Sequence, residues 1–266
     1  MILITGASGQ LASVVATRAK EAGLHFETAS RSPSADRPMD FDYPATLDFS
    51  GVTTLFLLSA GYAEDDIIIR RHGGVLAAAR RQGVKHVVYT SLSAASDHLA
   101  FALAHRWTER ALMDSGLNWT ILRNGLYAEL IGLLAAPRAG RISTPLGIAP
   151  ISAVARTDLA EAALKVISAP EVHTSATYEL SGINAFSLPE LALRMEVPYE
   201  PSSLSAERER LAALPLLPFQ PPMLMSISSA AMAGLLYCET SDLQKLIAQP
   251  RDALSVACEF AKQASS

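Results

Sequence analysis

The stretch of sequence with the most recognisable chemistry is a glycine-containing turn near the start of the chain. The apolar run Ile2–Thr5 predicts a buried strand, and it opens directly into a turn that contains Gly6 and Gly9. Gly6 allows a sharp reversal, and Gly9 has no Cβ to keep an anion away from the backbone. A helix predicted at residues 11–22 directs its free N–H groups and positive dipole end at the same place. The turn therefore predicts a phosphate-binding site, with a purely structural turn as the alternative.

The tip of the second predicted strand bears on which dinucleotide is bound. An acid at this place, about 20 residues beyond the glycine turn, commonly holds the ribose 2′-hydroxyl of NAD. Residues 29–31 read Ala-Ser-Arg instead, and the planar guanidinium of Arg31 suits the 2′-phosphate of NADP. Glu27 is a competitor, but it falls inside the strand. An exposed loop arginine without a ligand is the alternative for Arg31, and the pattern favours NADP.

The usual proton donor of short-chain reductases is missing. That donor is a tyrosine whose pKa is lowered by a lysine four residues later, and none of the 7 tyrosines has a lysine at this spacing. On the helix where the pair is expected, residues 99–115, His105 and Glu109 stand four residues apart and therefore share a face. His105 is a candidate acid or orienting group. An exposed histidine that pairs with Glu109 to stabilise the helix is an equally good interpretation.

The elements that must position these residues alternate along the first half of the chain. Strands are predicted at 2–5, 24–30, 53–59, 85–92 and 118–123, with a short one at 39–42, and helices at 11–22, 65–82 and 99–115. Such alternation predicts an α/β fold with a Rossmann-like, doubly wound parallel sheet. Ligands of such sheets bind beyond the carboxyl ends of the strands, which here are residues 6–10, 30–31, 59–60, 89–91 and 123–128.

Beyond residue 128 the pattern loosens, and a smaller α+β substrate lobe is expected. Helices are predicted at 157–167, 188–195 and 206–214 and a strand at 178–181, and a proline-rich bend at 214–222 leads into an apolar segment at 223–237. We assign 1–128 to an NADP-binding domain and 129–266 mostly to the substrate lobe, with helix 156–168 and strand 177–181 packing back onto the first domain. The lobe offers four candidates to line an apolar pocket, although such residues more often fill a core: Phe219, Met223, Met225 and Met232.

Composition excludes several classes of partner. The net charge of −4 and the scattered basic residues argue against nucleic acid. Cys238 and Cys258 are the only cysteines and lack the spacing of a metal site, which suits a reducing cytoplasm. No apolar run is long enough to span a bilayer, and the first apolar stretch lacks the charged region of a signal peptide. We expect a cytoplasmic protein without metal that acts on a small apolar or aromatic acceptor, with a homodimer as one open state of assembly.

Several segments together resemble the NmrA-like atypical short-chain dehydrogenase/reductases, most closely the branch of the type 2 NAD(P)H:quinone oxidoreductases and triphenylmethane reductases. These segments are residues 4–12, 71–79, 83–92, 105–112, 114–116, 121–127 and 156–160. The Arg-Asn-Gly-x-Tyr and Tyr-Thr-Ser-Leu segments are more specific than the glycine turn. The chain departs from the family in a trimmed third unit at 37–51, in Arg110 where lysine is expected, and in its C-terminal lobe.

An NADP(H) site formed by residues from five strand ends is expected: the resemblance implies four of these segments, and the end of the strand at 85–92 adds Thr90 and Ser91. The expected residues are Gly6, Ala7, Ser8, Gly9, Gln10, Leu11, Arg31, Ser59, Ala60, Thr90, Ser91, Arg123, Asn124, Gly125, Leu126 and Tyr127. The nicotinamide is expected between residues 90–91 and 125–127. There Tyr127 would stack on a flat acceptor and support a developing oxyanion with its hydroxyl, while a packed loop tyrosine is the alternative.

Together these features favour an NADPH-dependent reductase that transfers hydride to an electron-poor conjugated acceptor, and a quinone is the preferred candidate. A quinone accepts hydride without a strongly positioned proton donor, whereas an unactivated ketone does not, so the missing Tyr/Lys pair is tolerable. His105 then has an auxiliary role. Azo or triphenylmethane dyes, imines and enones are alternative acceptors. A non-catalytic NADP-binding redox sensor of the NmrA kind is the alternative of another class.

Overall fold

The computed structural model describes residues 1–60 and 63–265, which form two compact units. The first unit comprises Met1–Leu92, Leu103–Arg123 and Leu159–Tyr178. The second comprises Ser93–Ala102, Asn124–Asp158 and Glu179–Ser266. The chain therefore passes between the units several times, and neither unit is a single continuous segment.

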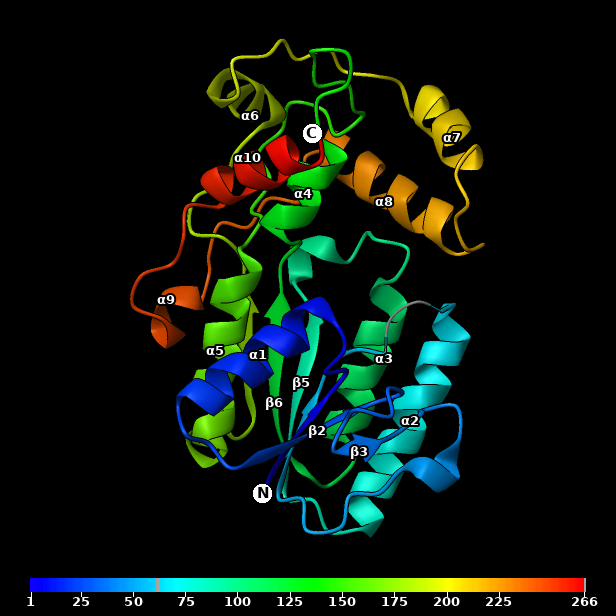
Figure 1. Ribbon diagram of the computed structural model, residues 1–266, viewed down its shortest axis with the longest axis vertical. Coiled ribbons are helices and arrows are strands. Elements are labelled where there is room, and N and C mark those ends of the chain that lie inside the picture. Colours follow the sequence, from blue (N-terminus) through cyan, green and yellow to red (C-terminus); the bar gives the residue numbers. More distant parts are fainter. Residues whose placement is uncertain (61–62, 266) are drawn as a thin grey trace. The chain divides into compact units, whose positions relative to one another are not determined.

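A seven-stranded parallel sheet in the order β3-β2-β1-β4-β5-β6-β7 is the main element of the first unit (Figure 1). Its strands are β1 (Ile2–Thr5), β2 (Phe26–Ser30), β3 (Arg37–Pro38), β4 (Thr54–Leu57), β5 (His86–Leu92), β6 (Asn118–Asn124) and β7 (Ala176–Leu180). The chain order reverses at β1, which lies between β2 and β4, so this is where the two halves of the sheet meet. The predicted α/β fold with a Rossmann-like sheet is confirmed.

Helices cover both faces of this sheet. They are α1 (Gln10–Glu21), α2 (Asp65–Arg81), α3 (Ala102–Met113) and α5 (Arg156–Ser168). Alternate residues of the central strands, such as Leu55 and Leu57 of β4, form one buried cluster with Val75 of α2. An ion pair between Arg18 and Glu161 joins α1 to α5. Figure 1 shows α1 and α5 on one side of the sheet and α2 and α3 on the other.

The second unit is mainly helical. Its helices are α4 (Ala128–Leu134), α6 (Leu188–Arg194), α7 (Leu204–Ala212), α8 (Gln220–Met232), α9 (Leu243–Leu246) and α10 (Ala253–Gln263). Helices α4 and α10 cross so closely that a Cβ on Gly132 would lie 2.3 Å from the carbonyl oxygen of Ala257. Glycine is required at this crossing because any side chain would push the two backbones apart.

The short third strand is not where the sequence predicts it. Residues 37–38 pair with the end of β2, and residues 39–42, the predicted strand, do not form one. Side chains explain the shift, because the Asp36 carboxylate accepts from the Thr28 N–H at 2.8 Å and the Arg37 guanidinium bonds Glu27. These contacts align the residues before position 39 with β2, and the chain then turns.

Helix predictions differ from the structure mainly at the ends and in the second unit. The helix expected at 99–115 begins only at Ala102, after a 3-10 turn at Ala94–Ser96, and the helix expected at 206–214 begins at Leu204, where Ser203 caps it. The sequence predicts no helix at α4, α8, α9 or α10, and at α8 it predicts only a proline-rich bend followed by an apolar segment. The reason is that α4 and α9 are short, and the buried face of α10 is made largely of small residues.

The α4–α10 crossing predicts a marked difference between two glycine substitutions. Gly132→Ala should lower the free energy of unfolding by about 1–3 kcal/mol, because the added methyl group overpacks the contact with Ala257. Gly74→Ala in α2 is the matched control, since nothing lies within 4 Å of its Cβ position; there alanine should stabilise the helix by up to about 1 kcal/mol. Denaturant unfolding measures both, and an equal effect of the two substitutions would contradict the crossing.

Candidate functional site

The glycine turn lies at the end of β1, as predicted, and its backbone conformation requires glycine. Gly6 has φ of 65°, and a Cβ at this position would lie 2.9 Å from Leu58 Cδ2. The turn closes on itself through a 2.7 Å hydrogen bond from the Gly9 N–H to the Gly6 carbonyl. A Cβ on Gly9 would lie 3.1 Å from that same oxygen. Both glycines therefore keep the backbone of the turn compact, in addition to leaving space for a ligand.

Helix α1 begins directly after this turn without a side-chain cap. Gly9 is the N-cap residue, no side chain accepts from the first N–H groups, and the first turn contains no acid. The free N–H groups and the positive end of the helix dipole thus remain available for an anion. Such a cradle fits the pyrophosphate of a dinucleotide.

The tip of β2 presents Arg31, and the competing candidate, Glu27, is engaged elsewhere. Arg31 is exposed and has no ion-pair partner in the part of the chain that the structure describes. The Glu27 carboxylate instead accepts from Arg37 Nε at 2.5 Å. Because Glu27 is held by this arginine within the sheet edge, it is poorly suited to bind a ribose hydroxyl. Arg31 thus presents an exposed cation at the strand tip.

The ends of β1, β4 and β5 are tied together by two threonine hydroxyls. Thr5 Oγ1 accepts from the Leu58 N–H at 3.0 Å and donates to the Phe56 carbonyl at 3.0 Å. Thr90 Oγ1 accepts from the Ser59 N–H at 3.1 Å. These bonds fix the backbone just beyond β4, where Ser59 is a predicted cofactor contact.

A buried histidine fixes the next peptide. The Ala60 N–H donates to Nε2 of His72 at 2.9 Å, and Nδ1 of His72 lies 2.7 Å from Thr108 Oγ1. The Thr108 hydroxyl donates its own proton to the Ala104 carbonyl at 2.7 Å. Nδ1 of His72 must therefore carry the proton that Thr108 accepts, and the ring is neutral. Burial lowers the pKa of His72 to about 3, which agrees with this assignment.

His105 is joined to the sheet through Tyr89, a residue that the sequence analysis did not select. The Tyr89 hydroxyl lies 2.9 Å from Nδ1 of His105, and the two ring centroids are 6.0 Å apart. Tyr89 is fully buried, whereas His105 is partly buried. Burial lowers the pKa of His105 to about 4, and the nearby Arg106 acts in the same direction. His105 is therefore a neutral imidazole near pH 7.

Glu109 does not pair with His105 as the helix spacing suggested. Its buried carboxylate accepts from Ser91 Oγ at 2.5 Å and from Nη1 of Arg106 at 2.7 Å, and it forms a bidentate pair with Arg123 at 2.9 and 2.7 Å. Burial raises the pKa of such a carboxyl, but the hydrogen bonds from Arg123 and Ser91 outweigh burial and hold the pKa of Glu109 below its usual value. Ser91 and Arg123, both predicted cofactor contacts, thus share one carboxylate.

The Arg-Asn-Gly-x-Tyr segment spans the boundary between the two units: Arg123 belongs to the first unit and residues 124–127 to the second. There the Gly125 N–H donates to the Leu180 carbonyl at 2.9 Å, and a Cβ on Gly125 would lie 3.3 Å from the Ser152 carbonyl oxygen. Tyr127 is the N-cap residue of α4, and the guanidinium of Arg156 lies 5.1 Å from the centre of its ring. Burial raises the pKa of Tyr127, so its phenol remains protonated at neutral pH.

The apolar candidates of the C-terminal lobe are placed on and beside α8. Phe219 precedes this helix, Met223 and Met225 are partly buried in it, and Met232 at its end is 49% exposed. These side chains neither form a closed core nor all lie on the surface. Their suggested role as a pocket lining stays a prediction.

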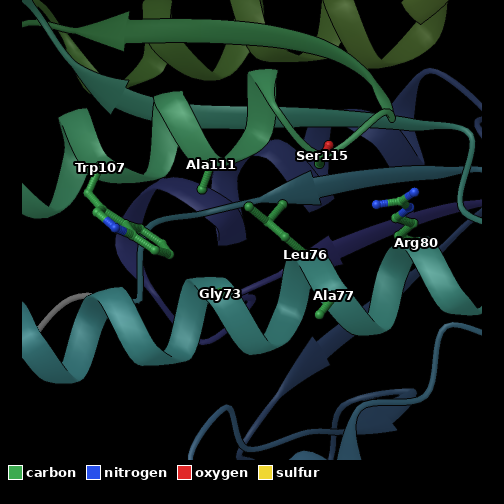
Figure 2. Close-up of a pocket in the computed structure, with 7 residues that line it drawn as sticks. All are labelled: Gly73, Leu76, Ala77, Arg80, Trp107, Ala111 and Ser115. Carbon is green, nitrogen blue, oxygen red and sulfur yellow. The ribbon is translucent and has the colours of Figure 1, made fainter.

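A groove of about 250 Å³ lies elsewhere, between α2 and α3 (Figure 2). Trp107 stands at one end of the groove and Arg80 and Ser115 at the other. The Trp107 ring reaches Gly73, where a Cβ would lie 3.2 Å from the indole. No predicted site residue lines this groove, so it is separate from the strand ends.

No protein-family model matches the chain, but curated relatives do. The chain is 32% identical over 278 residues to quinone oxidoreductase 2 of Escherichia coli strain K12, with 96% of each chain covered. It is also 32% identical over 171 residues to an NmrA-like family domain-containing oxidoreductase of Aspergillus flavus, with 53% of this chain and 56% of the relative covered.

Solved structures resemble the whole chain. The structure of an E. coli NADPH-dependent quinone oxidoreductase complexed with NADPH superimposes with a TM-score of 0.87 at 30% identity, covering 98% of this chain and 99% of that one. The triphenylmethane reductase of Citrobacter sp. complexed with NADP(H) gives a TM-score of 0.81 at 27% identity, covering 99% of both chains.

No helix in the described part of this chain is long and apolar enough to cross a membrane.

The buried neutral His72 predicts how stability depends on pH. Its pKa is about 3 in the folded chain and 6.5 when unfolded, so its contribution is complete above pH 6.5 and is lost as pH falls towards 3. Over this range, each such histidine lowers the free energy of unfolding by up to about 1.4 kcal/mol for every unit by which the pH falls. His72→Gln should remove one such contribution from the slope, whereas His25→Gln, at an exposed position, should leave the slope nearly unchanged. Unfolding titrations between pH 4 and 7 test this, and equal slopes in all three proteins would refute it.

Proposed function

Because this chain belongs to the NmrA-like family of atypical short-chain dehydrogenase/reductases, we propose that it is an NADPH-dependent quinone reductase. The similarity supports an NAD(P)H-dependent reductase of the quinone oxidoreductase 2 and triphenylmethane reductase type. The observation that carries the proposal is the open phosphate cradle at Gly6 and α1 together with the exposed Arg31, in a chain without a Tyr-x-x-x-Lys pair.

The cofactor part of the proposal uses residues of the first unit. The turn at residues 6–11 would hold the pyrophosphate, and Arg31 would hold the 2′-phosphate. Bound NADPH would supply a hydride. The loop after β4, fixed by Thr90 and His72, would form the wall of the site at Ser59 and Ala60. Residues 123–127 remain predicted contacts of the cofactor.

The role of the protein in the reaction is then mainly to orient its reactants. A quinone gains aromatic character on reduction, so it needs little help from a strong acid at the first step. His105 is neutral and partly exposed, so it suits a hydrogen-bond donor better than a proton reservoir. Tyr127, also protonated, is a second candidate donor.

Two alternatives follow from the same features. The likeness to a triphenylmethane reductase supports dye reduction, and imines or enones would suit the same hydride chemistry. A redox sensor that binds NADPH without turnover would also retain the phosphate cradle and lack the Tyr/Lys pair. The two classes differ in one respect: only the reductase oxidises NADPH when an acceptor is added.

Steady-state turnover tests the proposed function. The purified chain should oxidise NADPH with one equivalent of quinone reduced per NADPH, and quinones should exceed triphenylmethane dyes, azo dyes, enones and imines in kcat/KM. Absorbance at the NADPH band, with a parallel fluorescence titration of binding, provides both measurements. Tight NADPH binding without oxidation by any acceptor would favour the sensor, and faster turnover of a dye or enone would reassign the substrate.

Arg31 should set the preference for NADPH over NADH. Arg31→Asp removes charge-assisted contacts to the 2′-phosphate and adds repulsion, so the ratio of NADPH to NADH affinity should fall about tenfold or more. Arg208→Asp makes the same change of charge at an exposed position of α7 and should leave the ratio unchanged. Binding titrations of both variants provide the check. Equal affinities for the two dinucleotides in the unmodified chain would exclude this role.

A further inference from the structure

Tyr89, His105, His72 and Thr108 form a buried polar cluster between β5 and the helices α2 and α3. The His72 and Tyr89 rings meet edge to face with centroids 5.6 Å apart, and the Tyr89 hydroxyl reaches His105 on the other side. Tyr89 has the largest of the fully buried side chains in the described structure. A phenol in this position must find a hydrogen-bond partner within the protein.

The direction of the hydrogen bonds can be worked out from the donors available. The Thr108 proton goes to the Ala104 carbonyl, and Thr108 Oγ1 accepts from Nδ1 of His72. Burial raises the pKa of the Tyr89 phenol, and the neighbouring hydroxyls of Thr108 and Ser59 oppose this only in part. Tyr89 therefore keeps its proton, and Nδ1 of His105 lies within hydrogen-bond distance of the phenol at 2.9 Å. With the phenol as the donor, Nδ1 of the neutral ring is the acceptor.

The other nitrogen of His105 has no hydrogen-bond partner among the described residues. Within residues 1–60 and 63–265, Nδ1 makes the one hydrogen bond of this ring, and the side chain is partly exposed. A histidine that accepts at Nδ1 carries its proton on Nε2 when neutral, because the hydrogen bond at one nitrogen sets the state of the other. The exposed edge of the ring is then a donor.

We propose that Tyr89 is a positioning residue, whose hydroxyl donates to Nδ1 of His105 and so holds the imidazole as the Nε2–H tautomer, ready to donate a hydrogen bond to the acceptor oxygen. This inference rests on the proposed reductase function. The acceptor oxygen gains negative charge as its carbon or ring system accepts hydride, and a neutral N–H donor stabilises that charge without transferring a proton. The tautomer matters because the Nδ1–H form would instead present a lone pair to the same oxygen and repel it.

The tautomer is tested in the full chain without any reaction. Long-range ¹H–¹⁵N correlation spectra of the uniformly labelled protein at pH 7 distinguish the two neutral forms of each histidine. His105 should show the Nε2–H pattern and His72 the Nδ1–H pattern. An Nδ1–H pattern for His105 in the unmodified protein would overturn the proposal, whatever the variants do.

Tyr89→Phe tests the positioning role, since it keeps the ring and removes the hydroxyl. His105 should become a mixture of tautomers, and kcat with a quinone should fall about two- to tenfold, the effect of one neutral hydrogen bond, while KM for NADPH stays within about twofold. Tyr178→Phe is a matched control, because the Tyr178 hydroxyl lies 2.8 Å from Nδ1 of His173 in the same kind of pair. It should change the spectrum of His173 and leave His105 and kcat unaffected.

The outcomes separate this inference from the proposed function. If Tyr89→Phe leaves the His105 spectrum unchanged, or changes it without lowering kcat, the positioning role is wrong. If the unmodified chain oxidises no NADPH while His105 shows the Nε2–H pattern, the reductase proposal and the role in turnover fail, but the hydrogen-bond assignment holds. If Tyr89→Phe does not fold, the spectrum of the unmodified chain still decides the tautomer.

Discussion

The close approach of Gly6 to the residues after β4 is the constraint on which this end of the sheet depends. The sheet places β1 beside β4, and Leu58 leaves no room for a side chain at Gly6. The turn can therefore reverse only through a left-handed glycine, and α1 begins four residues later, at Gln10, with its N–H groups uncapped. The same packing that requires glycine at position 6 thus leaves the first N–H groups of α1 next to the end of β1.

The neighbouring strand ends are fixed by buried side chains rather than by the sheet alone. Thr5 and Thr90 bond the backbone after β4 from both sides, and His72 holds the peptide at Ala60. Each of these groups is buried with its hydrogen bonds made, so none carries the cost of an unsatisfied polar atom. Loops are usually mobile, and the backbone after β4 is anchored at three successive N–H groups, those of Leu58, Ser59 and Ala60.

The charged cluster around Glu109 also fixes strand ends, but through ion pairs rather than neutral hydroxyl groups. A buried carboxylate is costly unless it is paired, and here it accepts hydrogen bonds from Ser91, Arg106 and Arg123. The effect is to join α3 to the ends of β5 and β6. His105, one turn earlier on the same helix, therefore bonds Tyr89 and not Glu109.

The fold class, the positions of the glycine turn and Arg31, and the absence of the Tyr/Lys pair could be predicted from the sequence alone. These features depend on local backbone geometry and on alternation along the chain, which a linear pattern contains. The folded structure was needed to show that Glu109 bonds Ser91 and Arg123, that Arg37 holds Glu27, and that Tyr89 and His72 are part of the polar cluster. Those partners lie between 10 and 36 residues apart in the chain, and helix spacing, which compares residues three or four apart, cannot reveal them. The third strand and α10 escaped prediction for a related reason, since side-chain contacts across β2 and small residues packed on α4 set their positions.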